Sequence, residues 1–332
     1  MPIRSDASPA TSLPPGLTVR AAVLADAPAI RTLINEVDLV DTGEGGYAVE
    51  EVEADLRRTA DLARDSWLAF DRDRLVAYAI LWPASSGLRL DVDHYVLRDA
   101  LPAGIHLLDL LIVRSAEIAA ATPGAGDADL HLALTPDSVL AVHALPARGW
   151  RNVRRHHVLT RPVSVDVDSP PKVPGDVQIR VVTSPADEEI AYRLVQETFA
   201  GHFGFEATSY AEWRKRMDAD HRDWSLTWIA SRVDAATGQL VDVGVLVGHN
   251  EREATGWVQN LGTVAAARGT GIATLLLRTA FAVFAQRGRS AVGLGVDTEN
   301  VHNALRFYTG LGFELQFAAD TWRLLVPPAP RA

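Results

Sequence analysis

The residues of this 332-residue chain that are best suited to chemistry lie near its C-terminal end, in Thr263-Val-Ala-Ala-Ala-Arg268-Gly-Thr-Gly271-Ile-Ala273. Apolar residues precede this stretch at 257–261, and an Ala/Leu-rich run follows it at 275–284. The pattern predicts a strand, a glycine-rich turn and a helix. Gly269 and Gly271 allow positive φ angles, and such a turn directs backbone N–H groups and the positive end of a helix dipole at one point. That point suits a phosphate or pyrophosphate, whereas the same glycines in an isolated turn would only make a tight connection.

A second polar stretch, Leu294-Gly-Val-Asp-Thr-Glu-Asn300, comes shortly before Tyr308. A tyrosine hydroxyl, with a pKa of about 10, stays protonated at neutral pH and can give its proton to a thiolate whose thiol pKa is about 8.5. No residue is clearly marked as a general base. His202, Asp297 and Glu299 are candidates, and for each of them a capping or solvated role is the simpler interpretation.

Composition narrows the class of protein. The length is enough for two ordinary domains, and the 48% share of hydrophobic residues excludes general disorder. The absence of cysteine excludes disulfides, thiolate metal sites and a cysteine nucleophile. A net charge of −10 argues against nucleic acid as the main partner and is compatible with a cationic substrate. No apolar run is long enough to span a membrane, and residues 1–16 lack the core of a signal peptide, so we expect a cytoplasmic protein with a flexible tail at 1–16.

The elements that must position these residues follow the same plan twice. In the second half we predict strands at 177–182, 226–231, 240–248, 257–264, 291–296 and 321–326, with helices at about 186–199, 210–217, from the glycine turn to 287, and 303–309. In the first half we predict strands at 17–23, 67–70, 75–82, 88–97, 130–134 and 156–162, with helices from about Asp26, which can cap its first turn, at 49–59, at about 104–122 and at 139–145. Strands 67–70 and 75–82 are predicted to form a hairpin, as are 226–231 and 240–248.

The two halves can be aligned, which indicates a duplicated domain. Arg148-Gly-Trp150 aligns with Leu311-Gly-Phe313, and Arg20 aligns with Arg180. We therefore expect an N-terminal domain at 17–163, a proline-containing linker at 164–176 and a C-terminal domain at 177–327. The predicted fold class of each is α/β (α+β), with a mixed, mostly antiparallel sheet and helices on both faces. The strands before and after the glycine turn are predicted to be parallel.

The motifs of the second half resemble those of a known family. Arg268-x-x-Gly271-x-Ala273 resembles the pyrophosphate loop of the GNAT acetyltransferases, whose pattern is Arg/Gln-x-x-Gly-x-Gly/Ala. The stretch 294–300, with Ala304-Leu-Arg-Phe-Tyr308 and Leu311-Gly-Phe313, resembles a later motif of the same family. The resemblance covers about residues 177–326, and the whole chain is similar to tandem GNAT proteins. It implies an N-acetyltransferase that uses acetyl-CoA (coenzyme A) and direct attack by a primary amine.

The resemblance also implies roles for particular residues. The pyrophosphate would be bound by Arg268, Gly269, Thr270, Gly271, Ile272 and Ala273. The thioester carbonyl would accept hydrogen bonds from a splayed fourth strand that contains Leu261, Gly262 and Thr263. Tyr308 would be the general acid, and His202 would face the acceptor cleft as a candidate base. The pantetheine arm would hydrogen-bond to either Asn300 or Asn303. The family often places the asparagine that does this seven residues before the tyrosine, whereas Asn300 stands eight and Asn303 five residues before Tyr308. If Asn300 does not serve, it simply caps the next helix.

The N-terminal half lacks these residues at the aligned positions. Its loop at 98–104 has no Gly-x-Gly/Ala step, and Pro102 removes a backbone N–H. Leu145 aligns with Tyr308 and Asp137 with Asn300, and an aspartate repels a phosphate-bearing cofactor. We therefore expect a degenerate copy, and one acetyl-CoA site per chain in the C-terminal domain.

Several questions stay open at this level. The acceptor can be a small amine, such as an amino sugar, an antibiotic or a mycothiol-like precursor, or it can be a protein N-terminus or lysine. A non-catalytic acyl-CoA-binding sensor or scaffold shares the loop but does not need Tyr308. The residues of Asp91-x-Asp93-His94 are of metal-binding types, but on a strand the two aspartates share one face and His94 points away. We therefore predict a solvated strand face and no metal site. We expect no nucleic-acid or membrane partner, and a monomer or homodimer.

Overall fold

The computed structural model describes residues 13, 15–59, 61–83, 88–122, 124, 126–219, 223–252, 254–299 and 304–330. Residues 1–12 and 14 of the predicted tail lie outside this set, so the flexible tail stays a prediction. The chain divides into two compact units, one of residues 1–156 and 317–332 and the other of residues 157–316. We describe each unit separately.

The first unit is built on a sheet with the order β1-β2-β3-β4-β5-β12. Its strands are β1 (Leu17–Arg20), β2 (Ser66–Asp71), β3 (Arg74–Pro83), β4 (Arg89–Val96), β5 (Ala128–Leu134) and the Asp320–Val326 part of β12 (Glu314–Val326). The pairings of these neighbouring strands are antiparallel except that of β4 with β5, which is parallel. Its helices are α1 (Ala27–Asp41), α2 (Val49–Arg58), α3 (Leu62–Asp65), α4 (Leu101–Ala121) and α5 (Val139–His143), with short 3-10 helices η1 (Leu24–Asp26), η2 (Arg98–Ala100) and η3 (Pro146–Arg148).

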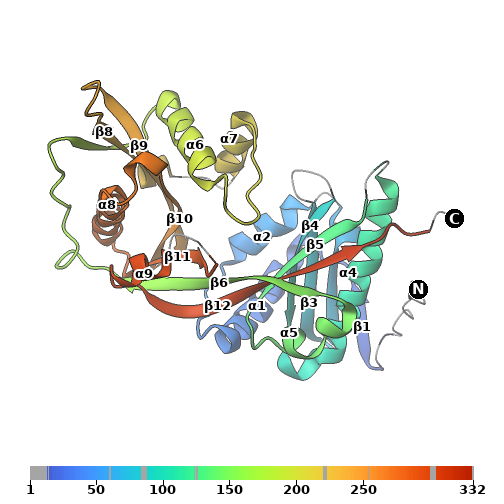
Figure 1. The fold of residues 1–332 in the computed structure, drawn as a ribbon. Helices are drawn as coiled ribbons and strands as arrows, with labels where there is room; N and C mark the ends of the chain where they lie inside the picture. Colours follow the sequence, from blue (N-terminus) through green and yellow to red (C-terminus); the bar gives the residue numbers. More distant parts are fainter. Residues whose placement is uncertain are drawn as a thin grey trace. The chain divides into compact units, whose positions relative to one another are not determined.

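Helices cover both faces of this first sheet (Figure 1). His94 on β4 hydrogen-bonds to the Gly104 carbonyl oxygen on α4 at 2.9 Å, so α4 lies on the His94 face. Trp82 on β3 donates from Nε1 to the Asp55 carbonyl oxygen on α2 at 3.3 Å on the opposite face. Because neighbouring side chains on a strand point to opposite faces, α1 and α2 cover one face of the sheet and α4 covers the other.

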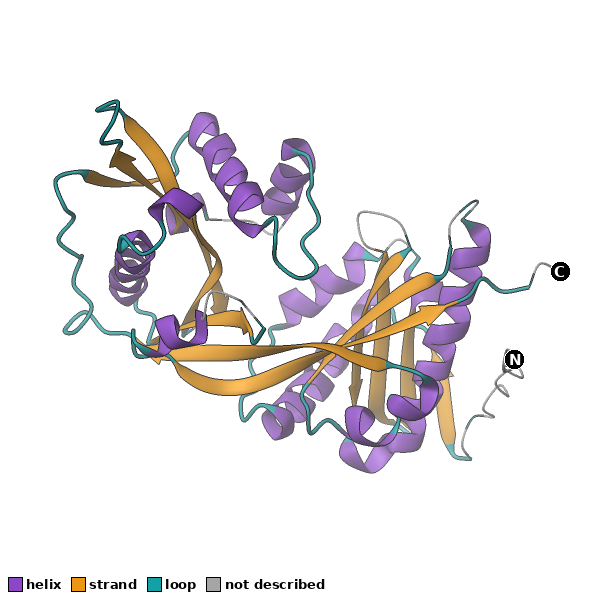
Figure 2. Ribbon diagram, viewed as in Figure 1, coloured by secondary structure: helices purple, strands orange, loops and turns teal. Residues whose placement is uncertain are grey.

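The second unit contains the order β6-β11-β10-β9-β8-β7. Its strands are β6 (Arg151–Pro162), β7 (Val177–Val181), β8 (Thr227–Val233), β9 (Leu240–Arg252), β10 (Thr255–Thr263) and β11 (Ala291–Asp297). Its helices are α6 (Pro185–Phe199), α7 (Tyr210–Ala219), α8 (Ile272–Gln286) and α9 (Ala304–Thr309), with 3-10 helices η4 (Trp224–Leu226) and η5 (Ala265–Ala267). On β9, Val245 and Val247 pack in the cluster that includes α6, whereas Leu246 packs in the cluster that includes α8. This alternation places α6 and α8 on opposite faces of the sheet (Figure 2).

Most of the predicted elements are confirmed. Each compact unit, rather than each half of the chain, has a mixed, mostly antiparallel sheet with helices on both faces, because β12 pairs with β5 and β6 lies beside β11. Both predicted hairpins are antiparallel pairs. The strand, turn and helix predicted around the glycines are β10, the turn and α8, and β10 runs parallel to β11 as expected. The repeat is also visible in the ion pairs, because Arg20 bonds Asp26 and Arg180 bonds Asp187 after the first strand of each half.

Four predicted details are corrected. The first strand ends at Arg20 rather than at 23, and the Asp26 carboxylate accepts from Arg20 (2.6 and 2.7 Å) and the Val23 N–H (2.9 Å) instead of capping α1. β6 begins at Arg151 rather than 156, and β12 begins at Glu314 rather than 321. Each of these two strands contributes residues to both compact units, and the domain bounds at 163 and 177 stay a prediction.

The packing of β10 against α8 gives a prediction about stability. Gly256 in β10 is buried, and an added Cβ would overlap the ring of Phe284 on α8. Gly256→Ala should destabilise the protein by about 1–3 kcal/mol, because the overlap forces the ring or the strand to move. Urea denaturation measures this. Gly295→Ala on β11 is the matched control, since no atom lies within 4 Å of its added Cβ, and a change there of the same size would contradict the packing argument.

Candidate functional site

The turn between β10 and α8 presents unpartnered backbone donors. Gly269 and Gly271 have φ angles of 75° and 90°, as predicted, and both are exposed. Gly271 is the N-cap of α8, and no side chain caps the helix. The first N–H groups of a helix have no acceptor within it, so those of Ile272, Ala273 and Thr274 are available to a ligand. Together with the helix dipole they favour an anion.

The strand before this turn separates from its parallel neighbour. β10 pairs with β11 only from Thr255 to Val258, opposite Ala291 to Leu294. The register of β10 against β9 then shifts between Val258 and Asn260, and β10 continues to Thr263 beside β9. This divergence opens the sheet between β10 and β11.

The divergence leaves two backbone donors pointing into the opening. The N–H of Val264 donates to the Val243 carbonyl oxygen at 3.0 Å, so it points toward β9. Because N–H directions alternate along a strand, the N–H groups of Leu261 and Thr263 point away from β9. They therefore face the side from which β11 has departed.

A cavity of about 630 Å³ occupies this opening. This volume lies within the usual range of small-molecule sites. The residues that line it come from the end of α6 and the loop after it, from β10, from the glycine turn and the start of α8, from the end of β11 and from α9. They are Thr198, Phe199, His202, Val258, Gln259, Leu261, Gly262, Thr263, Ala267, Arg268, Gly269, Gly271, Ile272, Ala273, Thr274, Leu294, Gly295, Val296, Asp297, Ala304, Phe307 and Tyr308.

Tyr308 lies on α9 at one wall of this cavity. Its ring packs against Phe307 at 5.2 Å and edge-on against Phe313 at 5.7 Å between ring centroids. Burial raises the pKa of Tyr308 to about 12. The hydroxyl therefore remains a neutral donor at physiological pH, and none of the other described residues forms a hydrogen bond with it.

His202 lines the same cavity from the loop after α6. Its backbone N–H donates to the Phe199 carbonyl oxygen at 2.8 Å, and its ring stacks on Phe199 with centroids 4.4 Å apart. Asp297 lines the cavity at the end of β11, and its carboxylate accepts the backbone N–H of Glu299 at 2.9 Å. Glu299 itself is not part of the lining. Asp297 therefore has the turn-capping bond that its sequence position suggests.

The structure brings ten of the predicted site residues into one cavity. They are His202, Leu261, Gly262, Thr263, Arg268, Gly269, Gly271, Ile272, Ala273 and Tyr308. Thr270 is not part of the lining, because its hydroxyl bonds the Ala267 carbonyl oxygen at 2.7 Å within the turn. Asn300 and Asn303 lie outside the described residues, so the choice between them stays open.

Sequence reasoning missed the residues that α6 brings to the site. Thr198 and Phe199 line the cavity, and Thr198 packs so closely on Gly262 that an added Cβ there would overlap its side chain. Gln259, at the bulge of β10, was also missed. The sequence offered one indication of these residues, because Phe199 stands only three residues before His202, which was already a candidate site residue.

The first unit shows the same strand divergence with different side chains. β4 pairs with β5 only from Arg89 to Val92, and β4 then continues beside β3. The start of α4 packs directly on β4, where an added Cβ on Gly104 would stand 2.9 Å from Val96. Leu145, aligned with Tyr308, is fully buried in the core.

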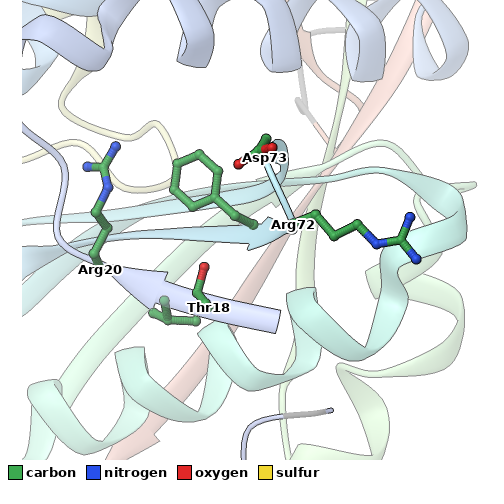
Figure 3. Close-up of a pocket in the computed structure, with 6 residues that line it drawn as sticks. Thr18, Arg20, Arg72 and Asp73 are labelled. Atoms are coloured by element: carbon green, nitrogen blue, oxygen red, sulfur yellow. The ribbon is translucent and has the colours of Figure 1, made fainter. Parts of the chain in front are cut away.

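A smaller hollow of about 300 Å³ lies at the β1 edge of this first unit (Figure 3). Arg20 there is already paired with Asp26 and stacks on Phe70 at 5.0 Å. Figure 3 shows the guanidinium groups of Arg20 and Arg72 pointing in different directions. The hollow therefore does not gather its charges on one point.

Membrane-spanning helices and metal clusters are both absent from the part of the chain that the structure describes. Within it, no helix is both long and apolar enough to cross a membrane. Within the same residues, no group of three or more His, Cys, Asp or Glu side chains can hold a metal ion. In particular, Asp91, Asp93 and His94 do not form a metal site.

Comparison with known proteins points to one family. A model of the acetyltransferase (GNAT) family matches residues 190–313, which lie within the second unit and contain both the glycine turn and Tyr308. None of the curated proteins matches the chain.

Solved structures match nearly the whole chain. A GCN5-related N-acetyltransferase from Sphaerobacter thermophilus is 27% identical, with a TM-score of 0.79 over 97% of this chain and 99% of its own. A tandem GNAT protein from the clavulanic acid biosynthesis pathway is 17% identical, with a TM-score of 0.67 over 95% of this chain and 100% of its own. A glucosamine N-acetyltransferase region of a fungal multi-domain β-N-acetylglucosaminidase is 13% identical, with a TM-score of 0.62 over 93% of this chain and 38% of that one. The last two likenesses concern the fold alone.

The partly buried position of Tyr308 predicts its titration. In protein labelled with ¹³C at tyrosine Cζ, the resonance of Tyr308 is the one that is missing from Tyr308→Phe. Its chemical shift should stay constant at every pH below about 11, because burial disfavours the phenolate. An exposed tyrosine would titrate near a pH of about 10. A midpoint for Tyr308 at or below that value would contradict the buried environment.

Proposed function

We propose that the C-terminal unit, within which the model of the acetyltransferase (GNAT) family matches residues 190–313, transfers an acetyl group from acetyl-CoA to a primary amine of a small molecule. The observation that carries this proposal is the cavity at the divergence of β10 and β11. It gathers a glycine turn, strand N–H groups without a strand partner and a neutral tyrosine hydroxyl. Acetyl-CoA would supply an acetyl group activated as a thioester.

The glycine turn fits the pyrophosphate of this cosubstrate. The exposed turn at 269–271 lets the backbone approach a ligand closely, and the N-terminus of α8 carries no side-chain cap. Arg268, at the cavity rim, adds a positive charge. These groups would hold the diphosphate and leave the pantetheine arm to run along the opening between β10 and β11.

The N–H groups of Leu261 and Thr263 would hydrogen-bond the thioester carbonyl oxygen. Negative charge grows on this oxygen when the amine attacks, and a single donor placed there can contribute about 10²–10³ in rate. These donors are already fixed by the pairing of β10 with β9, so little reorganisation is needed when the charge develops.

Tyr308 would give its proton to the departing thiolate. The raised pKa keeps the hydroxyl neutral, and the same partly buried surroundings would also raise the proton affinity of the thiolate sulfur. The donor and the acceptor are therefore shifted in the same direction. A neutral donor also avoids placing a second negative charge beside the thiolate.

The attacking amine must lose its proton, and His202 stands in the same cavity as Tyr308. We propose His202 as the group that orients or deprotonates the amine. The net charge of −10 favours a cationic small acceptor, and the glucosamine N-acetyltransferase region that shares the fold acts on an amine of this kind. The first unit, without the glycine turn and tyrosine, would bind no acetyl-CoA.

Replacement of Tyr308 separates catalysis from binding. Tyr308→Phe should lower kcat by about 10²-fold or more, because general acid catalysis contributes at least this much, and should leave acetyl-CoA affinity nearly unchanged. Release of free CoA in the presence of a panel of small amines and peptides measures turnover. Unchanged turnover would refute the acid role, and no CoA release with any amine would favour a non-catalytic acyl-CoA-binding protein.

A charge reversal tests the pyrophosphate site. Arg268→Glu should weaken acetyl-CoA binding by about tenfold or more, because it places a carboxylate beside the diphosphate. Calorimetric titration measures the affinity and should find one site per chain. Arg278→Glu is the matched control, because Arg278 is exposed on α8 and is not part of the cavity lining. Equal effects of the two variants, or two equivalent sites, would contradict the assignment.

A further inference from the structure

The first unit carries a polar cluster where its own strands diverge. The pairing of β4 with β5 ends at Val92, and Asp93 is the next residue of β4. Gln259 has the corresponding place in β10, because the pairing of β10 with β11 ends at Val258. Tyr78 on β3 stands opposite Tyr95 on β4, and their rings are stacked with centroids 6.4 Å apart. Because alternate residues share a face, Tyr78, Asp93 and Tyr95 lie together on the face away from His94 and α4.

The helix on this face adds polar groups to the cluster. Tyr47, just before α2, lies close to Asp55 on α2, and its hydroxyl lowers the pKa of Asp55, which burial raises. Arg58, one turn further along α2, lies over the ring of Trp82 at 4.1 Å. The cluster therefore contains two carboxylates, three tyrosines and one guanidinium. The face of Asp91 and Asp93, which the sequence predicted to be solvated, is partly covered, because both residues are half-buried.

The charges of this cluster are not balanced. Burial, and then the charges of Asp55, Asp91 and Asp38, raise the pKa of Asp93 to about 7, while Arg58 lowers it. The pKa values of Tyr78 and Tyr95 are also raised, first by burial and then by Asp93. Among the described residues named as causes of these three shifts, Arg58 is the only cation. The site is therefore electronegative, and a cation placed in it would be stabilised.

The Tyr78 side chain points to a missing ligand. It is 3% exposed, yet none of the described residues forms a hydrogen bond with its hydroxyl. In the described part of the chain, His94 Nδ1 and Trp150 Nε1 are examples of side-chain atoms that are fully buried and have no hydrogen-bond partner. The Tyr78 hydroxyl oxygen is not one of these atoms. The partner of this hydroxyl is therefore solvent, a ligand or a residue outside the described set. Buried hydroxyls in folded proteins nearly always have a partner.

We propose that the first unit binds a small organic cation, a protonated primary amine, between the carboxylates of Asp93 and Asp55 and the hydroxyls of Tyr78 and Tyr95. An ammonium group would pair with the carboxylates, and its three donors would reach the tyrosine oxygens. Aromatic rings also attract organic cations. A phosphate-bearing ligand would be repelled by the carboxylates.

Calorimetric titration of the full chain with n-butylammonium chloride at a pH of about 8 tests this proposal, with 1-butanol as the neutral control. The wild type should show saturable binding of the ammonium but not of the alcohol. Asp93→Asn should weaken it by about tenfold or more, whereas Asp91→Asn, whose carboxylate already pairs with Arg89 at 3.2 Å, should change it by less than about twofold. Tyr78→Phe should weaken it several-fold.

Two further readouts distinguish a ligand site from a structural role. At a pH of about 7, binding should release about half a proton per ligand, because the ammonium ionises Asp93. Asp93→Asn should also keep or raise the unfolding temperature, because an ionised Asp93 among Asp55, Asp91 and Asp38 opposes folding. Loss of stability in this variant would indicate a structural carboxylate.

Three outcomes would overturn the proposal. The first is no saturable binding of n-butylammonium. The second is equal affinity in the wild type and Asp93→Asn, which would place the amine elsewhere, for example at the cavity of Tyr308. The third is saturable binding of CaCl₂ that Asp93→Asn removes while the ammonium has no effect. None of these outcomes depends on acetyl transfer, so the result is independent of the proposed function.

Discussion

The candidate site depends on one break in strand pairing. β10 and β11 run parallel for four residue pairs and then separate after Val258. Continued pairing would have satisfied the N–H groups of Leu261 and Thr263 and left no space for a ligand. The break also sets the direction of the next elements, because β10 leads into the glycine turn and α8, while β11 is followed by α9 with Tyr308. The donors for a diphosphate, for a carbonyl oxygen and for a leaving group therefore converge on the same opening.

The sequence predicts the parts of this arrangement that are local. Gly269 and Gly271 need positive φ angles, and the apolar period after them needs a helix, so the turn could be placed from neighbouring residues alone. The sequence does not predict that α6 forms one wall of the cavity. The contact of Thr198 with Gly262 joins two segments that are far apart in the sequence and that local periodicity does not relate. The same limit explains why β6 and β12 were assigned to single domains, since a strand pattern is the same whichever sheet the strand joins.

Asp93 shows a second limit of sequence reasoning. Leu90 and Val92 alternate with Asp91 and Asp93 along β4, and this alternation is typical of a strand with one wet face. The pattern gives the face correctly but not what covers it. A residue that faces other polar side chains gives the same pattern as one that faces water, so the effect of Asp55 on the pKa of Asp93 becomes visible only in the structure.

The two units retain the same backbone break and differ in what they leave without a partner. In the second unit these groups are N–H donors and a neutral hydroxyl, which suit negative charge; in the first they are a carboxylate and tyrosine hydroxyls, which suit positive charge. Arg155 and Asp320 show the contrasting case, because their two hydrogen bonds at 2.6 and 2.8 Å satisfy both groups within the fold. The pKa of Tyr308 is raised by burial alone, whereas that of Asp93 is raised by burial and by the charges of Asp55, Asp91 and Asp38 against the opposing charge of Arg58. A fold that leaves such groups unsatisfied is less stable alone than it could be, and a ligand of the right charge restores what it lacks.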